Sequence, residues 1–183
     1  MENPLLELQE YENLQEALKK AKGPVQATGT LDSQKVHLMY WLGKDGGFPW
    51  KLVVTYDDQR AREIYDDFRS FTENVWLYPA KDLLFYSADI HGNLMTRQRI
   101  AVWRHLMEEK EGVVVTTLDG LMDHLLPLVF LKQQAVTVEN GQIMDLDEWK
   151  ERLTALGYEC TAQVDGMGQF SIRGGIVDIF PLT

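Results

Sequence analysis

The stretch that comes closest to a chemical motif is Ala27-Thr-Gly-Thr-Leu-Asp-Ser-Gln-Lys-Val, which has a glycine followed six residues later by a lysine. Phosphate-binding loops follow the pattern GxxxxGK[ST], because backbone amides wrap the phosphates, the lysine reaches the outer phosphates and a hydroxyl holds Mg²⁺. Here no second glycine precedes Lys35, Val36 follows it, and Asp32 adds a negative charge where phosphate would bind. We therefore expect Gly29 and Lys35 to belong to a degenerate loop that binds no nucleotide.

Other candidates for catalysis or metal binding are weaker. The four histidines are His37, His91, His105 and His124. They are scattered, without HExxH spacing or cysteine partners, so we expect them to be core or surface residues. Asp145 opens a run that resembles a calcium loop, but Lys150 stands at its sixth position and Leu156 at its twelfth, so helix capping explains Asp145 better. We expect no catalytic residue and no metal site.

The composition indicates a soluble globular protein. The 183 residues carry a formal net charge of −10 and are 45% hydrophobic, which suffices for a packed core. No apolar run approaches the ~18 residues of a membrane span, and the lone Cys160 excludes an intrachain disulfide, so we expect a cytoplasmic protein. The acidic charge argues against a sequence-independent grip on nucleic acid, which needs clustered lysine and arginine.

Residues 1–122 alternate between helical and strand patterns. The predicted helices are 4–21, a segment from about 36 to 43, a segment capped by Asp57 or Asp58, and about 94–109. The predicted strands are 25–28, 51–56, 75–78 and 113–117. Such alternation implies parallel strands joined by right-handed crossovers. We therefore expect an α/β domain in which the apolar run 113–117 is a strand covered on both sides.

Residues 123–183 change to an α+β pattern, for which we expect an antiparallel sheet. The predicted strands are 134–138, 158–164, 169–173 and 176–180, with a helix at 146–156 capped by Asp145. Gly174 and Gly175 between two apolar runs predict a hairpin, and Arg173 lies at its bend. Residues 124–183 contain eight acidic and four basic side chains, which makes Arg173 conspicuous. We expect this sheet to lack later strands.

Several motifs, in order, resemble the N-terminal module of the bacterial transcription-repair coupling factor (Mfd) family, which is similar to the excision-repair protein UvrB. They are Leu52-Val-Val-Thr, Trp76-Leu-Tyr-Pro-Ala-Lys-Asp-Leu-Leu-Phe-Tyr86, Arg97-Gln-Arg-Ile-Ala-Val-Trp, Gly112-Val-Val-Val-Thr-Thr and Gly168-Gln-Phe-Ser-Ile-Arg-Gly-Gly-Ile-Val-Asp-Ile-Phe-Pro181. The last motif is the most specific. The resemblance spans roughly residues 24–181 and implies a degenerate P-loop NTPase-like fold, followed by part of an antiparallel subdomain.

Two departures separate the chain from UvrB-like proteins, which have an intact phosphate loop and a long aromatic-rich hairpin after their equivalent of Tyr86. Here the loop is degenerate and only Ser87-Ala-Asp-Ile-His-Gly-Asn-Leu lies before the next predicted helix. The resemblance therefore implies a non-catalytic module that needs no cofactor. It also implies that ATP, RNA polymerase and double-stranded DNA are bound by domains absent from this chain.

In that family the second subdomain recruits the damage sensor UvrA, and the resemblance implies that Arg173 and, less firmly, Gly174 form part of the UvrA-binding surface. The alternative for Arg173 is a solvated turn residue paired with Asp178 or Asp165. We expect Phe180 and Pro181 to serve the core and strand termination. Two alternative functions stay open, namely a fragment of a UvrB-like ATP-dependent DNA repair enzyme and a purely structural α/β fragment.

Overall fold

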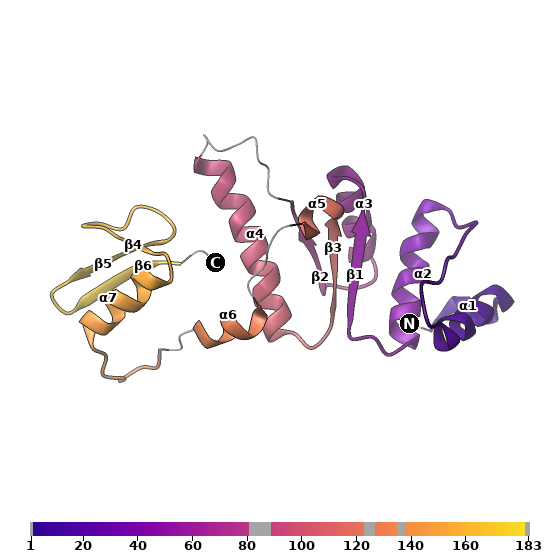
Figure 1. Cartoon of the computed structure of the whole chain (residues 1–183), viewed down its shortest axis with the longest axis horizontal. Coiled ribbons are helices and arrows are strands. Elements are labelled where there is room, and N and C mark those ends of the chain that lie inside the picture. Colours follow the sequence, from indigo (N-terminus) through magenta and orange to yellow (C-terminus); the bar gives the residue numbers. More distant parts are fainter. Residues whose placement is uncertain (1, 81–88, 123–126, 135–137, 182–183) are drawn as a thin grey trace. The chain divides into compact units, whose positions relative to one another are not determined.

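The computed structural model describes residues 2–80, 89–122, 127–134 and 138–181, without the side chains of 89–96, 130, 131 and 134. The chain forms two compact units (Figure 1). The first unit is Met1–Ala80 with Glu109–Asp123, and the second is Lys81–Glu108 with His124–Thr183. The domain boundary predicted at residues 122 and 123 stays a prediction. Motif residues 81–86 and His124 lie outside the described residues.

A three-stranded parallel sheet organises the first unit. Its strands are β1 (Trp50–Thr55), β2 (Val75–Tyr78) and β3 (Gly112–Thr117), in the order β1-β3-β2. The central Val115 aligns with Val53 of β1 and Leu77 of β2. Every residue of β3 is buried, as expected for a continuous apolar run between two neighbours. The predicted parallel α/β arrangement is confirmed.

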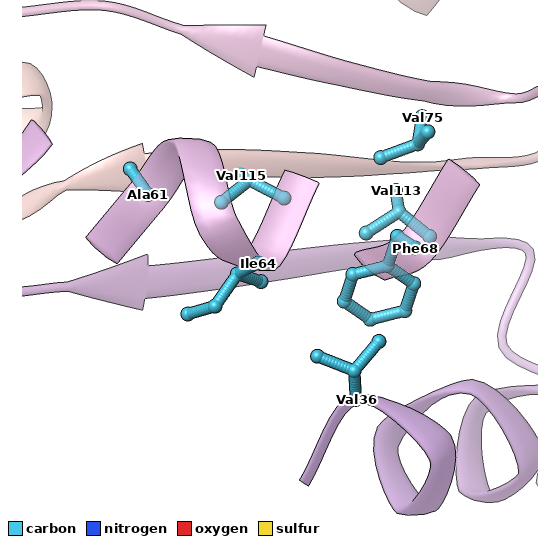
Figure 2. Close-up of a cluster of buried hydrophobic side chains, with 7 residues drawn as sticks. All are labelled: Val36, Ala61, Ile64, Phe68, Val75, Val113 and Val115. Carbon is cyan, nitrogen blue, oxygen red and sulfur yellow. The ribbon is translucent and has the colours of Figure 1, made fainter. Parts of the chain in front are cut away.

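Two helices build the core on one face of this sheet (Figure 2). They are α2 (Asp32–Asp45) and α3 (Asp58–Arg69). The core cluster consists of Val36, Ala61, Ile64, Phe68, Val75, Val113 and Val115. The α3 members recur at intervals of three and four residues, so they share one helical face. Of the two capping residues predicted for α3, Asp57 is the N-cap, and its carboxylate accepts a 2.7 Å hydrogen bond from the Arg60 amide.

The single N-terminal helix predicted at 4–21 is wrong in one respect, because the structure divides it at Leu8. A 3₁₀ turn, η1 (Pro4–Glu7), precedes α1 (Gln9–Lys20), and Leu8 between them is extended, with φ −97° and ψ 122°. The Asn3 side chain accepts a hydrogen bond from the Leu5 amide, which caps the short turn separately from α1. A local cap thus divides what the amphipathic pattern joins.

The N-terminal segment is hydrogen-bonded to one carboxylate at the end of α2. The Asp45 Oδ2 atom accepts hydrogen bonds from Asn3 (2.6 Å), the Tyr11 hydroxyl (2.7 Å) and Gln15 (3.3 Å). Tyr11 is only 3% exposed. Burial and the neighbouring Asp45 carboxylate together raise the pKa of Tyr11 from 10.0 to about 12.

Helices of the second unit are α4 (Asp89–Glu108), α6 (Leu128–Gln134) and α7 (Leu146–Ala155), and α5 (Leu118–Leu121) belongs to the first unit. As predicted, Asp145 caps α7, with its Oδ1 atom accepting from the amides of Asp147 (2.9 Å) and Glu148 (3.3 Å). Helix α7 contacts β4 and β5 of the second sheet. Its Leu153 is 5% exposed, and Phe170 of β5 is fully buried.

The second sheet is mixed rather than antiparallel, which corrects the prediction. Its strands are β4 (Glu159–Cys160), β5 (Gln169–Arg173) and β6 (Ile176–Phe180), in the order β4-β5-β6. β5 and β6 form the predicted antiparallel hairpin, but β4 runs parallel to β5. The loop at 161–168 returns the chain for this pairing, and the Ser171 hydroxyl donates a 3.1 Å hydrogen bond to the Ala162 carbonyl within it.

Three strand predictions need correction. Residues 25–28 form no strand, because they are mostly exposed and bury no face against the sheet. Of the strand predicted at 158–164, only Glu159–Cys160 pairs, since the following residues form the loop to β5. Gln134, the predicted start of strand 134–138, ends helix α6, and 135–137 lie outside the described residues.

The hairpin turn consists of Gly174 and Gly175, since Arg173 pairs with Ile176. Gly174 has φ +60°, whereas Gly175 is not among the glycines with positive φ. A positive φ at the first central position alone is characteristic of a type II′ turn, whose twist matches that of the flanking strands. A Cβ atom at either position would meet no heavy atom within 4 Å. Backbone conformation therefore distinguishes the two glycines.

Gly174→Ala is predicted to lower the free energy of unfolding by about 1 kcal/mol, because an L-residue is strained at positive φ. Gly175→Ala is the matched control and is predicted to change stability by less than half as much. Urea unfolding followed by circular dichroism measures both values. Equal losses in the two variants would contradict the turn assignment.

Stability is predicted to fall at alkaline pH because of Tyr11. Its folded pKa is raised, so the stabilisation is complete below pH 10 and is lost as the pH rises through about 12. Urea unfolding of wild type and Tyr11→Phe at several pH values between 9 and 12 measures this as a shrinking stability difference between them. Tyr56→Phe is the control, because Tyr56 is 77% exposed and should follow the wild-type profile. A constant difference between wild type and Tyr11→Phe across this range would refute the assignment.

Candidate partner-binding surface

The hairpin register determines which side chains accompany Arg173. Successive residues of a strand point to opposite faces, so Phe170 and Ile172 share one face of β5 and Ser171 and Arg173 share the other. The partners on β6 follow the same rule, because Ile172 aligns with Val177 and Arg173 with Ile176. The face that bears Arg173 therefore also bears Ile176, Asp178 and Phe180. We call these four residues the open face.

The four residues of the open face are accessible and partly apolar, whereas Ser171 on the same side of β5 is 1% exposed and donates to the Ala162 carbonyl. Ile176 is 62% exposed and Phe180 is 45% exposed. The opposite face of the hairpin contains the fully buried Phe170. The assignment of Phe180 to the core is therefore wrong. A two-residue turn at Gly174 and Gly175 already implies that Phe180 shares the face of Arg173, so the signal was present in the sequence.

Arg173 forms an ion pair with Asp178. Its guanidinium donates a 2.5 Å hydrogen bond to the Asp178 carboxylate, and the two side chains are 60% and 43% exposed. Of the two partners considered from the sequence, the structure selects Asp178. The Asp165 backbone amide instead donates to the Gln169 side chain at 3.1 Å. Exposed ion pairs contribute only about 0–1 kcal/mol, so Arg173 can exchange Asp178 for another carboxylate at little cost.

The degenerate phosphate loop takes a conformation that places an acid at the start of α2. Gly29 has φ +85° in the loop, and Lys35 lies in the first turns of the helix. The Lys35 ammonium contacts the Asp32 carboxylate at 3.0 Å, and the Arg60 guanidinium contacts the same oxygen at 3.2 Å. The hydrogen bond from Lys35 and the charge of Arg60 lower the pKa of Asp32. Asp32 is therefore a carboxylate that pairs with both Lys35 and Arg60.

Two other residues considered for chemistry, His37 and Cys160, lie in the described part of the chain. His37 accepts a 2.9 Å hydrogen bond from the Trp41 indole and stacks on Phe71 at 5.3 Å between ring centroids. Cys160 is exposed on the short strand β4. Within the described residues, no group of three or more histidine, cysteine, aspartate or glutamate side chains could hold a metal ion. The helices described there also include none long and apolar enough to cross a bilayer.

A family model, the UvrB interaction domain, matches residues 136–183, the segment that contains α7 and the β5–β6 hairpin. Transcription-repair-coupling factors are also similar to the chain. The protein of Staphylococcus aureus (strain USA300) is 29% identical over 133 residues, and that of Bacillus subtilis (strain 168) is 31% identical over 134 residues. Each alignment covers 72% of this chain and 11% of the relative.

The family match covers the segment that contains the last and most specific of the motifs, Gly168–Pro181. The alignments span only about a ninth of the relatives' length. The chain belongs to the transcription-repair-coupling factor family and carries its UvrB-like module.

Proposed function

We propose that this chain is a non-catalytic adaptor module of transcription-coupled nucleotide excision repair, which recruits UvrA to stalled RNA polymerase. The observation that carries the proposal is the exposed Arg173 on a partly apolar open face, within the segment that matches the UvrB interaction domain. The family relationship supports the repair context. The bacterial cytoplasm is the setting of the proposed function.

The open face has the composition of an interaction hot spot. Arginine and aromatic residues dominate binding energy at interfaces, especially when surrounding groups exclude water. Ile176 and Phe180 supply apolar area beside the Arg173 guanidinium. An incoming carboxylate can replace Asp178 and form a bidentate pair with Arg173, whose planar fork matches carboxylate geometry.

Gly174 acts in the proposed site through the backbone. Its positive φ closes the two-residue turn and so keeps Arg173 opposite Ile176. A different turn length would shift the register and move alternate side chains to the other face. Gly174 is thus a positioning residue for the open face.

RNA polymerase and double-stranded DNA are proposed partners of other parts of the larger protein. The net charge of −10 supports this division, because DNA binding without sequence preference requires clustered basic groups. We propose no cofactor for this chain and assign ATP use to other domains.

The alternative is a fragment of a UvrB-like ATP-dependent repair enzyme, for which the degenerate loop would have to bind nucleotide. Asp32 disfavours it, because its carboxylate pairs with both Lys35 and Arg60 at the start of α2. A phosphate there would meet an anion and would have to displace it from both cations.

Titration of the full chain with MgATP is predicted to give no saturable heat in calorimetry. Lys35→Ala serves as the matched variant and is predicted to behave as wild type does. If the wild-type chain binds ATP with micromolar affinity and Lys35→Ala abolishes that binding, the UvrB-like enzyme hypothesis is favoured over the adaptor hypothesis.

Binding of the chain to purified UvrA is predicted to weaken about 30-fold in Arg173→Glu, as expected for an interface hot spot worth ~2 kcal/mol. Reversal of charge also places a second acid beside Asp178. Arg152→Glu is the matched control, because Arg152 is exposed on α7 and undergoes the same charge change. Calorimetry gives the affinities, and circular dichroism verifies that each variant is folded.

Equal weakening by Arg173→Glu and Arg152→Glu would reduce the effect to general charge and remove Arg173 from the site. Absence of UvrA binding by the wild-type chain would contradict the adaptor function for this chain.

A further inference from the structure

A second site lies in the first unit, away from the degenerate phosphate loop in sequence and built from different residues. A cavity of ≈ 280 Å³ opens where the three parallel strands begin and helix α2 ends. Its lining includes Tyr40, Lys44, Phe48, Lys51, Asn74 and Glu111. None of these residues belongs to the open face, so this site is independent of the proposed function.

Lys51 enters the cavity along a path that a glycine keeps clear. Gly43 lies buried inside α2, a position at which glycine is a poor helix former. A Cβ atom at Gly43 would come within 2.5 Å of the Lys51 Cε atom and 3.0 Å of its Cγ atom. The helix therefore accepts an unfavourable residue where the lysine side chain passes. This close approach explains why a glycine stands at position 43, which helix formation alone does not explain.

The two ammonium groups of the cavity have no carboxylate partner among the ion pairs of the described residues. Lys44 lies over the Tyr40 and Trp41 rings, 5.8 and 5.0 Å from their centroids. Lys51 is half-buried and takes part in no ion pair or side-chain hydrogen bond within the described ranges. Its ammonium is available to a ligand.

Neighbouring groups leave the cavity modestly positive. Glu111 supplies one negative charge against Lys44 and Lys51. The carbonyls at the end of α2 accept backbone hydrogen bonds, from the Phe48 amide to Gly43 (3.0 Å) and from the Gly46 amide to Leu42 (2.9 Å). The negative end of the helix dipole offsets part of the charge of the two lysines. Tyr40, Phe48 and Pro49 add apolar lining beside the charges.

We propose that this cavity binds a compact organic oxyanion, whose phosphate or carboxylate group contacts Lys51 and whose apolar body packs on Phe48 and Tyr40. Lys51 supplies a point charge, which suits phosphate and carboxylate oxygens alike. Asn74 and Thr72 line the same cavity and offer polar side chains to the anion. The volume admits a small ring with one charged group rather than a dinucleotide.

The test is a titration of the full isotope-labelled chain with phenyl phosphate, benzoate and inorganic phosphate, followed by NMR shifts of backbone amides. Phenyl phosphate or benzoate is expected to shift amides at residues 43–51, 72–74 and 111–113 in a saturable manner. Inorganic phosphate is expected to bind at least about 10-fold more weakly, because it lacks the apolar body. Failure of all three probes to saturate would overturn the proposal.

Lys51→Met removes the charge and keeps a flexible apolar stem, and it is expected to weaken phenyl phosphate and benzoate binding about 10-fold or more. Lys132→Met, at an exposed position of α6, is the matched control and should bind as wild type does. Equal weakening in both variants would indicate general charge attraction and overturn the site.

Gly43→Ala separates binding from folding. Alanine is the better helix former, and its Cβ displaces the flexible Lys51 stem rather than backbone. The variant is therefore expected to stay folded, as circular dichroism can verify, and to lose affinity as Lys51→Met does. A folded Gly43→Ala variant with wild-type affinity would show that the path of Lys51 does not matter and would contradict the proposal.

Discussion

The two-residue turn at Gly174 and Gly175 is the constraint on which the proposed partner surface depends. Because a strand alternates faces with a period of two, a one-residue change in register would place Ile176 and Phe180 on the opposite face from Arg173. The turn needs a positive φ, which glycine adopts without strain. The chemistry at Arg173 thus depends on a backbone requirement one residue later.

In the first unit, the burial of β3 has the corresponding role. Its valines hold α2 and α3 against one face of the sheet (Figure 2), and this packing places the start of α2 beside Arg60 of α3. Asp32 can then pair with both Lys35 and Arg60. The segment whose spacing resembles a phosphate loop thus forms a local ion-pair network. The same helix, at its other end, frames the cavity that contains Lys51.

Elements with strong local signals could be predicted from the sequence. The period of α3, the caps Asp57 and Asp145, and the glycine turn of the hairpin all depend on neighbouring residues. Features that depend on distant partners could not. Residues 25–28 have strand composition but no partner that buries them, and β4 pairs in parallel because a loop brings it back to β5. The Arg173–Asp178 pair was one of two alternatives, and only the register selects it. The path of the Lys51 side chain could not be predicted either, because it depends on the close approach of Gly43 in α2 to Lys51 in β1.

The most direct test of the central claim is hydrogen exchange of the full chain, measured by mass spectrometry with and without UvrA. UvrA is predicted to slow exchange in peptides covering Gln169–Arg173 and Ile176–Phe180, where the open face lies. Slowing confined to Met1–Ala80 and Glu109–Asp123, with the hairpin unchanged, would contradict it.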